Sequence, residues 1–218
     1  MKKSLIILSL IISALHVFAQ DSNWGLRAAF DINIPGKIGG IADTDAGKLL
    51  KERYRQGYGG TIGVVYDHWL SGSIFLQPGL SLFYDTYSYK DLIIMEDEVG
   101  KEEKDPSLYK LGVRVPVVIG YSYDFIDALP MRVYTGPELS YAFAGDIRFK
   151  NRDQVGDWHL FGKDGEQRRF DVAWKLGLGV DFDLATVSIE ATLGLTDLCP
   201  GNLSFRDNRV SVAVTHFF

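Results

Sequence analysis

The feature that most constrains this sequence is an alternation of apolar and polar residues with a period of two, which recurs from residue 24 to the end of the chain. It is clearest in residues 170–184, where every even position is apolar and the odd positions include Asp171, Lys175 and Asp183. Successive side chains of a β-strand point to opposite faces, whereas a helix would spread the two sets around its circumference. This segment is therefore predicted to be a strand with one apolar and one polar face.

Seven further segments alternate in the same way, which gives eight predicted strands. These seven are residues 24–34, 58–69, 73–85, 110–125, 131–145, 185–195 and 209–218. A two-residue connection at Asp183 and Leu184 would keep the apolar sets of its two strands on one side, as a tight hairpin requires. The connections alternate in length: residues 35–57, 86–109, 146–169 and 196–208 form long ones, and the three between them are short.

Alternating long and short connections and an even number of strands are typical of bacterial outer-membrane barrels, which have long external loops and short periplasmic turns. After residue 20 the longest strongly apolar stretch, residues 115–121, has only the length of a strand and contains Pro116 and Gly120. A closed barrel is the structure other than a helix that can span lipid, because it leaves no backbone group unpaired. The sequence predicts an all-β fold, an eight-stranded antiparallel up-and-down transmembrane β-barrel.

A soluble lipocalin-type barrel or a β-sandwich would show the same alternation with its apolar side chains turned inward. Two observations favour the membrane barrel. The polar face consists of small and charged residues, which suits a polar lumen, and aromatic residues such as Trp24, Tyr58 and Phe182 gather near strand ends, as interfacial girdles do. We therefore expect the apolar face to point outward.

Residues 1–19 have the pattern of a secretory signal peptide. Lys2 and Lys3 precede an apolar run from Leu5 to Leu15, and Val17 and Ala19 occupy the positions that a signal peptidase reads before Gln20. The alternative, a transmembrane anchor, would need about 20 apolar residues. We expect residues 20–218 to form one barrel domain in the bacterial outer membrane.

Composition excludes several functional classes. With a net charge of −5 the chain lacks the basic surface of a nucleic-acid binder, so no nucleic-acid partner is expected. Its single cysteine, Cys199, excludes an intramolecular disulfide and a cysteine-clustered zinc site. The mean hydropathy of +0.01 follows from alternation, since the apolar and polar faces cancel in the average.

Four segments carry a resemblance to a known family. They are LGVRVPVVIGYSYDF with Pro116, MRVYTGPELSYAF with Gly136 and Pro137, FDVAWKLGLGVDFDLATVSIEATLGLTDL, and the terminal VSVAVTHFF. The chain resembles the PorT-like outer-membrane β-barrel proteins of Bacteroidota, often labelled porin family. The resemblance implies a fold and a location but no shared activity, because fold does not determine function. Phe218 resembles the terminal signal read by the outer-membrane assembly machinery, which implies that machinery as a partner. For a barrel in the outer membrane, outer-membrane lipid and lipopolysaccharide are the other expected partners.

Turning the polar face inward places a group of charged side chains in the lumen. They are Arg27, Asp31, Arg114, Arg132, Glu138, Asp171, Lys175 and Glu190. An eight-stranded barrel is just wide enough for side chains to fill. We expect these charges to form a paired plug, because buried charges must be matched. The alternative is a narrow gated pore or a proton-sensitive network, since ionisable residues inside a membrane protein are often functional.

The loops and histidines give weaker signals. Residues 86–109 hold seven acidic residues and three lysines, which indicates an ordinary solvated loop or, alternatively, a collector of divalent cations. Phe161 and its aromatic neighbours could pack on the barrel lip or contact a ligand, and we expect packing. No histidine can be placed beside a nucleophile or in a metal spacing, so no catalytic residue, cofactor or metal ligand is predicted. We expect a non-enzymatic structural or surface-interaction role. The alternatives are a narrow channel for small solutes and an outer-membrane lipid-modifying enzyme.

Overall fold

A computed structural model describes most of the chain outside the long loops and the N-terminus. The described residues are 23–36, 54–89, 107–126, 129–148, 158–162, 167–182, 185–199 and 205–218. The predicted signal peptide, residues 1–19, and the acidic part of the second long connection, residues 90–106, lie outside them. Within the described residues, no helix has the length and apolar character to cross a membrane.

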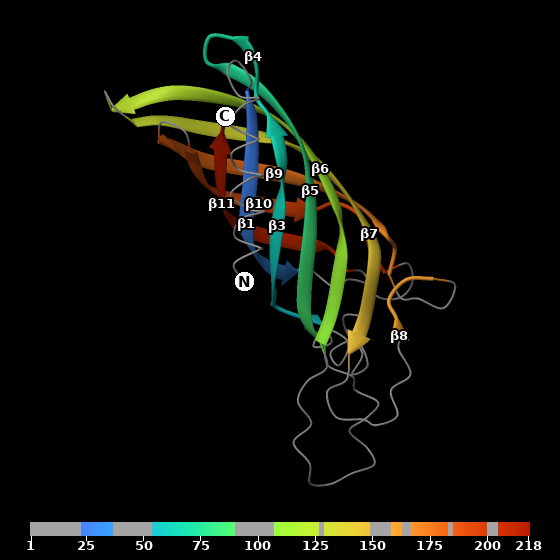
Figure 1. The fold of residues 1–218 in the computed structure, drawn as a ribbon. Helices are drawn as coiled ribbons and strands as arrows, with labels where there is room; N and C mark the ends of the chain where they lie inside the picture. The colour runs from blue at the N-terminus through green and yellow to red at the C-terminus, as the bar shows by residue number, and fades with distance from the viewer. Residues whose placement is uncertain are drawn as a thin grey trace, which may run out of the picture.

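Eight antiparallel strands close into a barrel (Figure 1). They are β1 (Trp24–Pro35), β3 (Gly57–Tyr66), β5 (Ile74–Tyr89), β6 (Ser107–Ile126), β7 (Leu129–Arg148), β9 (Phe170–Phe182), β10 (Ala185–Gly194) and β11 (Asp207–Phe217). Three short strands extend it: β2 (Tyr54–Arg55), β4 (His68–Ser71) and β8 (Trp158–His159). Each long strand contains the core of one predicted segment, and β11 pairs with β1 to complete the ring. The predicted all-β, eight-stranded antiparallel barrel is confirmed.

The two ends of the barrel differ in the way the sequence predicts. Ala185 pairs with Phe182 across the predicted tight hairpin, and Gly25 pairs with Phe217, so the start of β1 and the end of β11 lie with the short connections. We call the end of the barrel with the short connections the turn end. The opposite end, with the long connections, is the loop end. Between β3 and β5 the short connection is itself a small hairpin, in which β4 pairs with β5 and the turn includes Gly72 at a φ of 44°.

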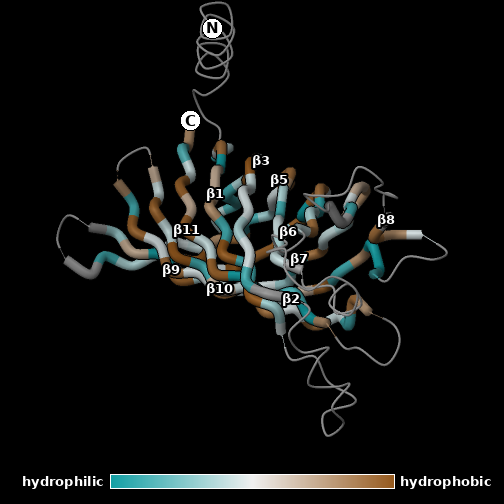
Figure 2. The backbone as a smooth tube through the Cα atoms, turned by 90° about the horizontal axis from the view of Figure 1, so that it is seen from below, coloured by the Kyte–Doolittle hydropathy of each residue, from teal (hydrophilic) through white to brown (hydrophobic). Residues whose placement is uncertain are grey.

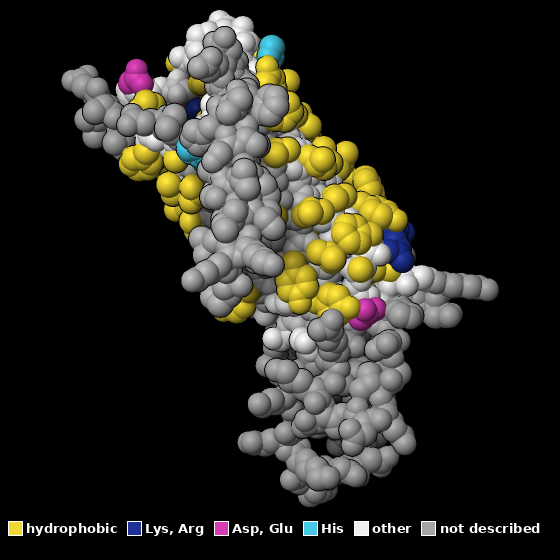
Figure 3. All heavy atoms as spheres, viewed as in Figure 1, with side chains coloured by type: hydrophobic (Ala, Val, Ile, Leu, Met, Phe, Trp, Pro, Cys, Tyr) yellow, Lys and Arg dark blue, Asp and Glu magenta, His cyan; other side chains and the backbone are white. Residues whose placement is uncertain are grey.

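Apolar side chains cover the outside of the barrel and polar ones fill its inside. Along β10, Ile189 is 62% exposed whereas its neighbour Glu190 is 2% exposed. Brown and teal alternate along the strands in Figure 2, and Figure 3 shows apolar side chains over the outer wall. Aromatic pairs lie near both rims, such as Trp24 with Tyr66 at the turn end. An outer surface of this kind suits hydrocarbon rather than water, as in transmembrane barrels.

Prolines interrupt the backbone ladders on both sides of β6. Proline has no N–H to donate, and the pairing with β5 and with β7 skips positions next to Pro116 and opposite Pro137. The strands nevertheless stay close, because a Cβ built on Gly136 would lie 2.1 Å from the carbonyl oxygen of Val117. Glycine is therefore required at this position.

Candidate functional site

A line of ion pairs crosses the lumen and joins side chains of β7, β9, β10 and β1. Lys175 of β9 lies between two carboxylates, with its Nζ 2.8 Å from Glu138 Oε2 of β7 and 3.1 Å from Glu190 Oε2 of β10. Glu190 in turn lies 2.6 Å from a guanidinium nitrogen of Arg27 on β1. All four side chains are buried, so their charges are compensated by one another rather than by water.

A second branch reaches the other side of the barrel. Arg114 of β6 is paired with Asp31 at 2.9 Å, contacts Asp85, and has its Nε 3.8 Å from Glu138. Arg209 of β11 pairs with Glu138 and lies 3.8 Å from Asp31. The two branches therefore share Glu138 and form one structure, which we call the ion-pair network. Its members are Arg27, Arg114, Lys175 and Arg209, with Asp31, Asp85, Glu138 and Glu190.

Hydroxyl groups complete the network. The hydroxyls of Thr61 and Ser211 each donate a hydrogen bond of 2.5 Å to Asp31, and the Tyr134 hydroxyl donates to Glu190. A cavity at the centre has a volume of about 10 Å³, which is room for about one water molecule. The middle of the lumen is therefore filled by side chains.

Arg132 lies apart from this network, at the turn end. It pairs with Asp67 and, at 2.6 Å, with Asp181. Three aromatic rings lie around its guanidinium at 5.1 to 5.5 Å, those of Trp69, Phe75 and Phe217. Such contacts combine charge pairing with cation–π attraction. Together with Asp67, Asp181 and these three rings, Arg132 forms what we call the turn-end cluster.

Asp171 lies inside the barrel without an ion pair within the described part of the chain. Its side chain faces the loop-end half of the lumen and is 8% exposed, and its Oδ1 has no hydrogen-bond partner. Both side-chain atoms of Asn33, which is fully buried, also lack a partner. Of the eight predicted lumen charges, the structure therefore unites six and places Arg132 and Asp171 elsewhere.

Besides Asp67 and Asp181 of the turn-end cluster, the sequence argument did not single out four lumen residues that carry pairs. Arg209 and Asp85 belong to the ion-pair network, and Lys110 Nζ lies 2.7 Å from Asp207 at the loop end. Each occupies the inward face of its strand. The signal that could have found them is strand parity: Arg209, for instance, shares its parity with Ser211, whose hydroxyl bonds to Asp31.

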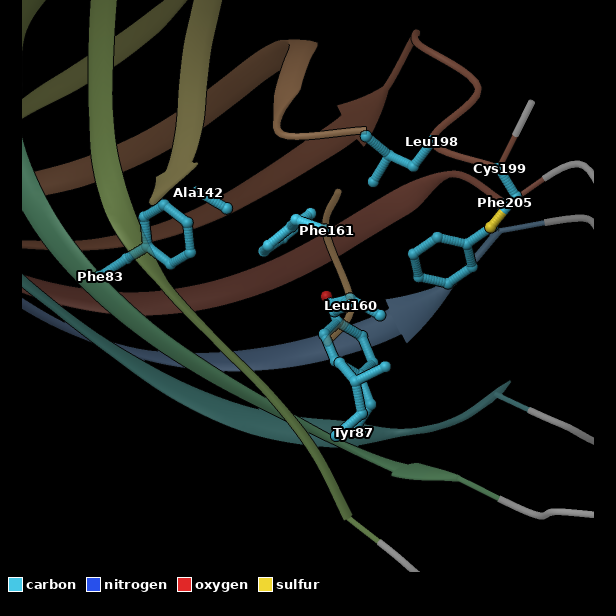
Figure 4. Packing of buried hydrophobic residues seen from close by; sticks show 9 residues of the cluster. Phe83, Tyr87, Ala142, Leu160, Phe161, Leu198, Cys199 and Phe205 are labelled. Atoms are coloured by element: carbon cyan, nitrogen blue, oxygen red, sulfur yellow. The ribbon is translucent and has the colours of Figure 1, made fainter. Parts of the chain in front are cut away.

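An apolar cluster closes the lumen at the loop end (Figure 4). We call it the loop-end lid, and it consists of Phe83, Tyr87, Leu108, Ala142, Leu160, Phe161, Leu198, Cys199 and Phe205. The last five come from the segments that follow β8 and β10. Backbone hydrogen bonds hold them down: Leu160 N–H donates to Gly145 at 3.1 Å, and Leu198 N–H donates to Phe205 at 2.8 Å. Phe161 thus packs at the barrel lip, as expected.

The chemistry that this arrangement supports is electrostatic and structural. Within the described strands and loop segments, no group of three or more His, Cys, Asp or Glu side chains is placed to hold a metal ion. On the outer surface His68 stacks on Tyr66, and His216 contacts Phe218 edge to face. Apart from Asp171, the buried charges of the described residues are matched by charges of opposite sign, which is how proteins make ionised groups tolerable away from water.

Comparison with known proteins gives a family but no close relative. No curated protein matches the sequence. Similar solved structures include the outer membrane enzyme PagL (12% identity over 88% of this chain and 99% of that chain, TM-score 0.45). Another is OprG of Pseudomonas aeruginosa (11% identity over 91% of this chain and 94% of that chain, TM-score 0.42). A third is Ail of Yersinia pestis (9% identity over 90% of this chain and 99% of that chain, TM-score 0.39). Similarity at this level carries no information on function. Residues 18–199 match the outer membrane protein beta-barrel domain, and the chain belongs to that family.

Proposed function

We propose that this protein is a non-conducting, non-enzymatic outer-membrane barrel with a structural or surface-interaction role. The observation that carries the proposal is that the lumen is filled at three successive levels. The turn-end cluster, the ion-pair network and the loop-end lid each place buried side chains across it. With the lumen occupied, the parts of the chain that can meet other molecules are the outer wall and the external loops.

Energetics support a permanently filled lumen. Removing one partner of a buried ion pair costs about 3–5 kcal/mol, because the other charge is left without compensation. Opening a water-filled passage would separate several such pairs at once, among them those of Lys175 with Glu138 and Glu190. Rehydration would return part of this cost, yet the apolar lid would also have to leave its packed position.

Conductance is the direct test of this proposal. The full mature chain, reconstituted into planar lipid bilayers, is expected to give no discrete current steps, while a general porin treated in the same way gives them. As a matched control, Lys175→Ala with Glu138→Ala removes two central side chains and is expected to admit ions if the barrel still forms. Discrete steps from the unsubstituted protein would overturn the proposal.

Steps of that kind would instead support the second candidate, a narrow channel for small solutes. The observation in its favour is the row of ionisable side chains along the lumen, a feature that often marks ion pathways in membrane proteins. Uptake of a small radiolabelled solute into vesicles would separate a true channel from leakage at the barrel rim.

We further propose a PorT-like relationship and three partners: outer-membrane lipid, lipopolysaccharide and the outer-membrane assembly machinery. In support of the last, β11 is the strand that closes the ring on β1, and the Phe218 N–H donates a 3.0 Å hydrogen bond to Trp24. Deleting Phe218 is expected to lower the yield of folded barrel in cells. The folded barrel is measured as the form whose migration on an SDS gel changes on heating. An unchanged yield of this form would contradict an assembly signal at Phe218.

A further inference from the structure

Basic side chains outside the lumen gather at one place. Every Lys and Arg whose side chain the structure describes is buried inside the barrel, apart from Arg168, Arg169 and Arg206. These three arginines precede β9 and β11 at the loop end. In Figure 3, the larger group of basic side chains lies at the lower right edge of the apolar wall, and a small spot of basic colour is visible at the upper left. The outer surface therefore carries its described positive charge at a single rim.

Strand parity places two of these arginines on the lipid-facing side. Arg168 is exposed and follows the outward parity of Phe170, while its neighbour Gln167 is buried. Arg206 is likewise exposed, between the buried Phe205 and Asp207, and has the outward parity of the exposed valine at position 210. Arg168 is thus the first outward position beyond the apolar band of its strand, and Arg206 is the second, after Asn208. Both lie toward the level where hydrocarbon gives way to headgroups.

The two positions are neighbours across the rim. The Arg168 N–H donates to Leu198 at 2.7 Å, and the Leu198 N–H donates to Phe205, which adjoins Arg206. Arg168 and Arg206 are therefore separated by two spacings between hydrogen-bonded backbone segments, which is roughly 10 Å. Arg169 lies beside Arg168, where its guanidinium donates a 2.7 Å hydrogen bond to the Phe143 carbonyl and covers the lid residue Phe161 at 5.0 Å.

No carboxylate in the described residues neutralises Arg168 or Arg206. Asp197 belongs to the segment between them, and its Oδ1 accepts hydrogen bonds from the backbone N–H groups of Cys199 and Phe205. At the turn end, the outward positions of the rim carry His68 and His216 instead of arginine. Among the described residues, the loop-end rim thus offers positive charge without a paired carboxylate, next to an apolar wall.

We propose that Arg168, Arg169 and Arg206 form a binding site for the phosphate groups of a phosphorylated glycolipid in the outer leaflet, with its acyl chains against the apolar wall of β9 to β11. Guanidinium groups bind phosphate through charge-assisted, often bidentate hydrogen bonds. Basic groups at a membrane surface attract anionic headgroups in the same way. The spacing of Arg168 and Arg206 suits a headgroup with more than one phosphate. The inference requires an outer-membrane barrel but does not depend on whether the lumen conducts.

The test measures thermal stabilisation by a defined lipid. The full mature chain in detergent micelles is titrated with lipopolysaccharide, with the same lipopolysaccharide after dephosphorylation, and with inorganic pyrophosphate. The readout is the temperature at which the folded form is lost on a gel. The variants are Arg168→Gln with Arg206→Gln, Arg168→Lys with Arg206→Lys, and the control Asp124→Asn, which removes an exposed charge near the turn end.

Phosphorylated lipopolysaccharide is expected to stabilise the unsubstituted chain and the Asp124→Asn control equally. The double glutamine variant is expected to bind it roughly 30-fold more weakly, from about 1 kcal/mol per surface arginine. The double lysine variant should keep most of the affinity. Equal stabilisation of the glutamine variant, or by dephosphorylated lipid, would overturn the proposal. Equal stabilisation by pyrophosphate would also overturn it, because the site would then take a soluble anion.

Discussion

The substitution Glu138→Gln tests the ion-pair network at its centre. Glu138 faces Arg209, Lys175 and Arg114, and its two oxygens are used by different cations. The network as a whole holds four cations and four carboxylates, so its formal charge is zero. Glutamine keeps the size of the side chain and removes the charge. The variant therefore leaves one buried positive charge without compensation.

The expected loss follows from the distances. At an effective dielectric constant near 20, two unit charges 4 Å apart attract by about 4 kcal/mol, and Lys175 lies closer than that, at 2.8 Å. Some of this attraction remains in the variant, because Glu190 still faces Lys175 and Asp31 still faces Arg209. We expect a loss of about 3 kcal/mol in the free energy of unfolding, in the range for a broken buried pair.

Asp171→Asn is the matched control, because it also converts a lumen acid to its amide. Asp171 has no ion pair within the described residues, so removing its charge relieves a desolvation cost. Its variant is expected to be as stable as the parent or more so. Urea titration of the reconstituted protein, followed by tryptophan fluorescence, measures the free energy of unfolding of both variants. A loss below about 1 kcal/mol for Glu138→Gln, or equal losses for the two variants, would refute the assignment of the network.

Three further substitutions test the packing around the network. Gly177→Ala would place a Cβ 2.2 Å from the ring of Tyr134 and is expected to lower stability in the same urea titration by about 1–3 kcal/mol. Gly179→Ala, whose nearest contact would be 3.0 Å, should cost less, and the reverse order would contradict the packing. In the lid, Phe205→Ala is expected to speed maleimide labelling of the buried Cys199 at least tenfold, since such a truncation costs about 3–5 kcal/mol. An unchanged labelling rate would mean that the lid does not protect this thiol.

The strands and their faces could be predicted because alternation is a local signal with a physical cause. Ile189 and Glu190 differ in exposure as their parity requires. Parity assigns a face but not a height along the barrel, because strand tilt decides which inward residues meet. Asp171 faces inward as predicted, yet it lies toward the loop end and forms no ion pair within the described residues. Arg209 shows the converse, since its parity indicated the lumen and only the fold shows that it pairs with Glu138.

The loop-end lid could not be predicted for a different reason. Its members Leu160, Leu198 and Phe205 come from segments without periodicity, so nothing local indicates where they pack. Their positions depend on barrel closure, which brings the segments after β8 and β10 over the same opening. The inward Phe83 and Tyr87 also depart from a purely polar lumen, because they supply the apolar surface on which those segments rest.

Because the lid is built from residues next to the strands, the described residues by themselves place side chains across the lumen. Leu160 is tied to Gly145 of β7, and Leu198 to Phe205 beside β11, so these lid segments are anchored to the barrel. Changes in loop sequence between these anchors would leave the ion pairs and the lid in place. A chain of this design can vary its external surface without opening its lumen. Exchange of residues 90–106 is accordingly expected to change what binds at the surface while bilayer conductance stays at zero. Current steps that appear only after this exchange would show that the loop itself occludes the barrel.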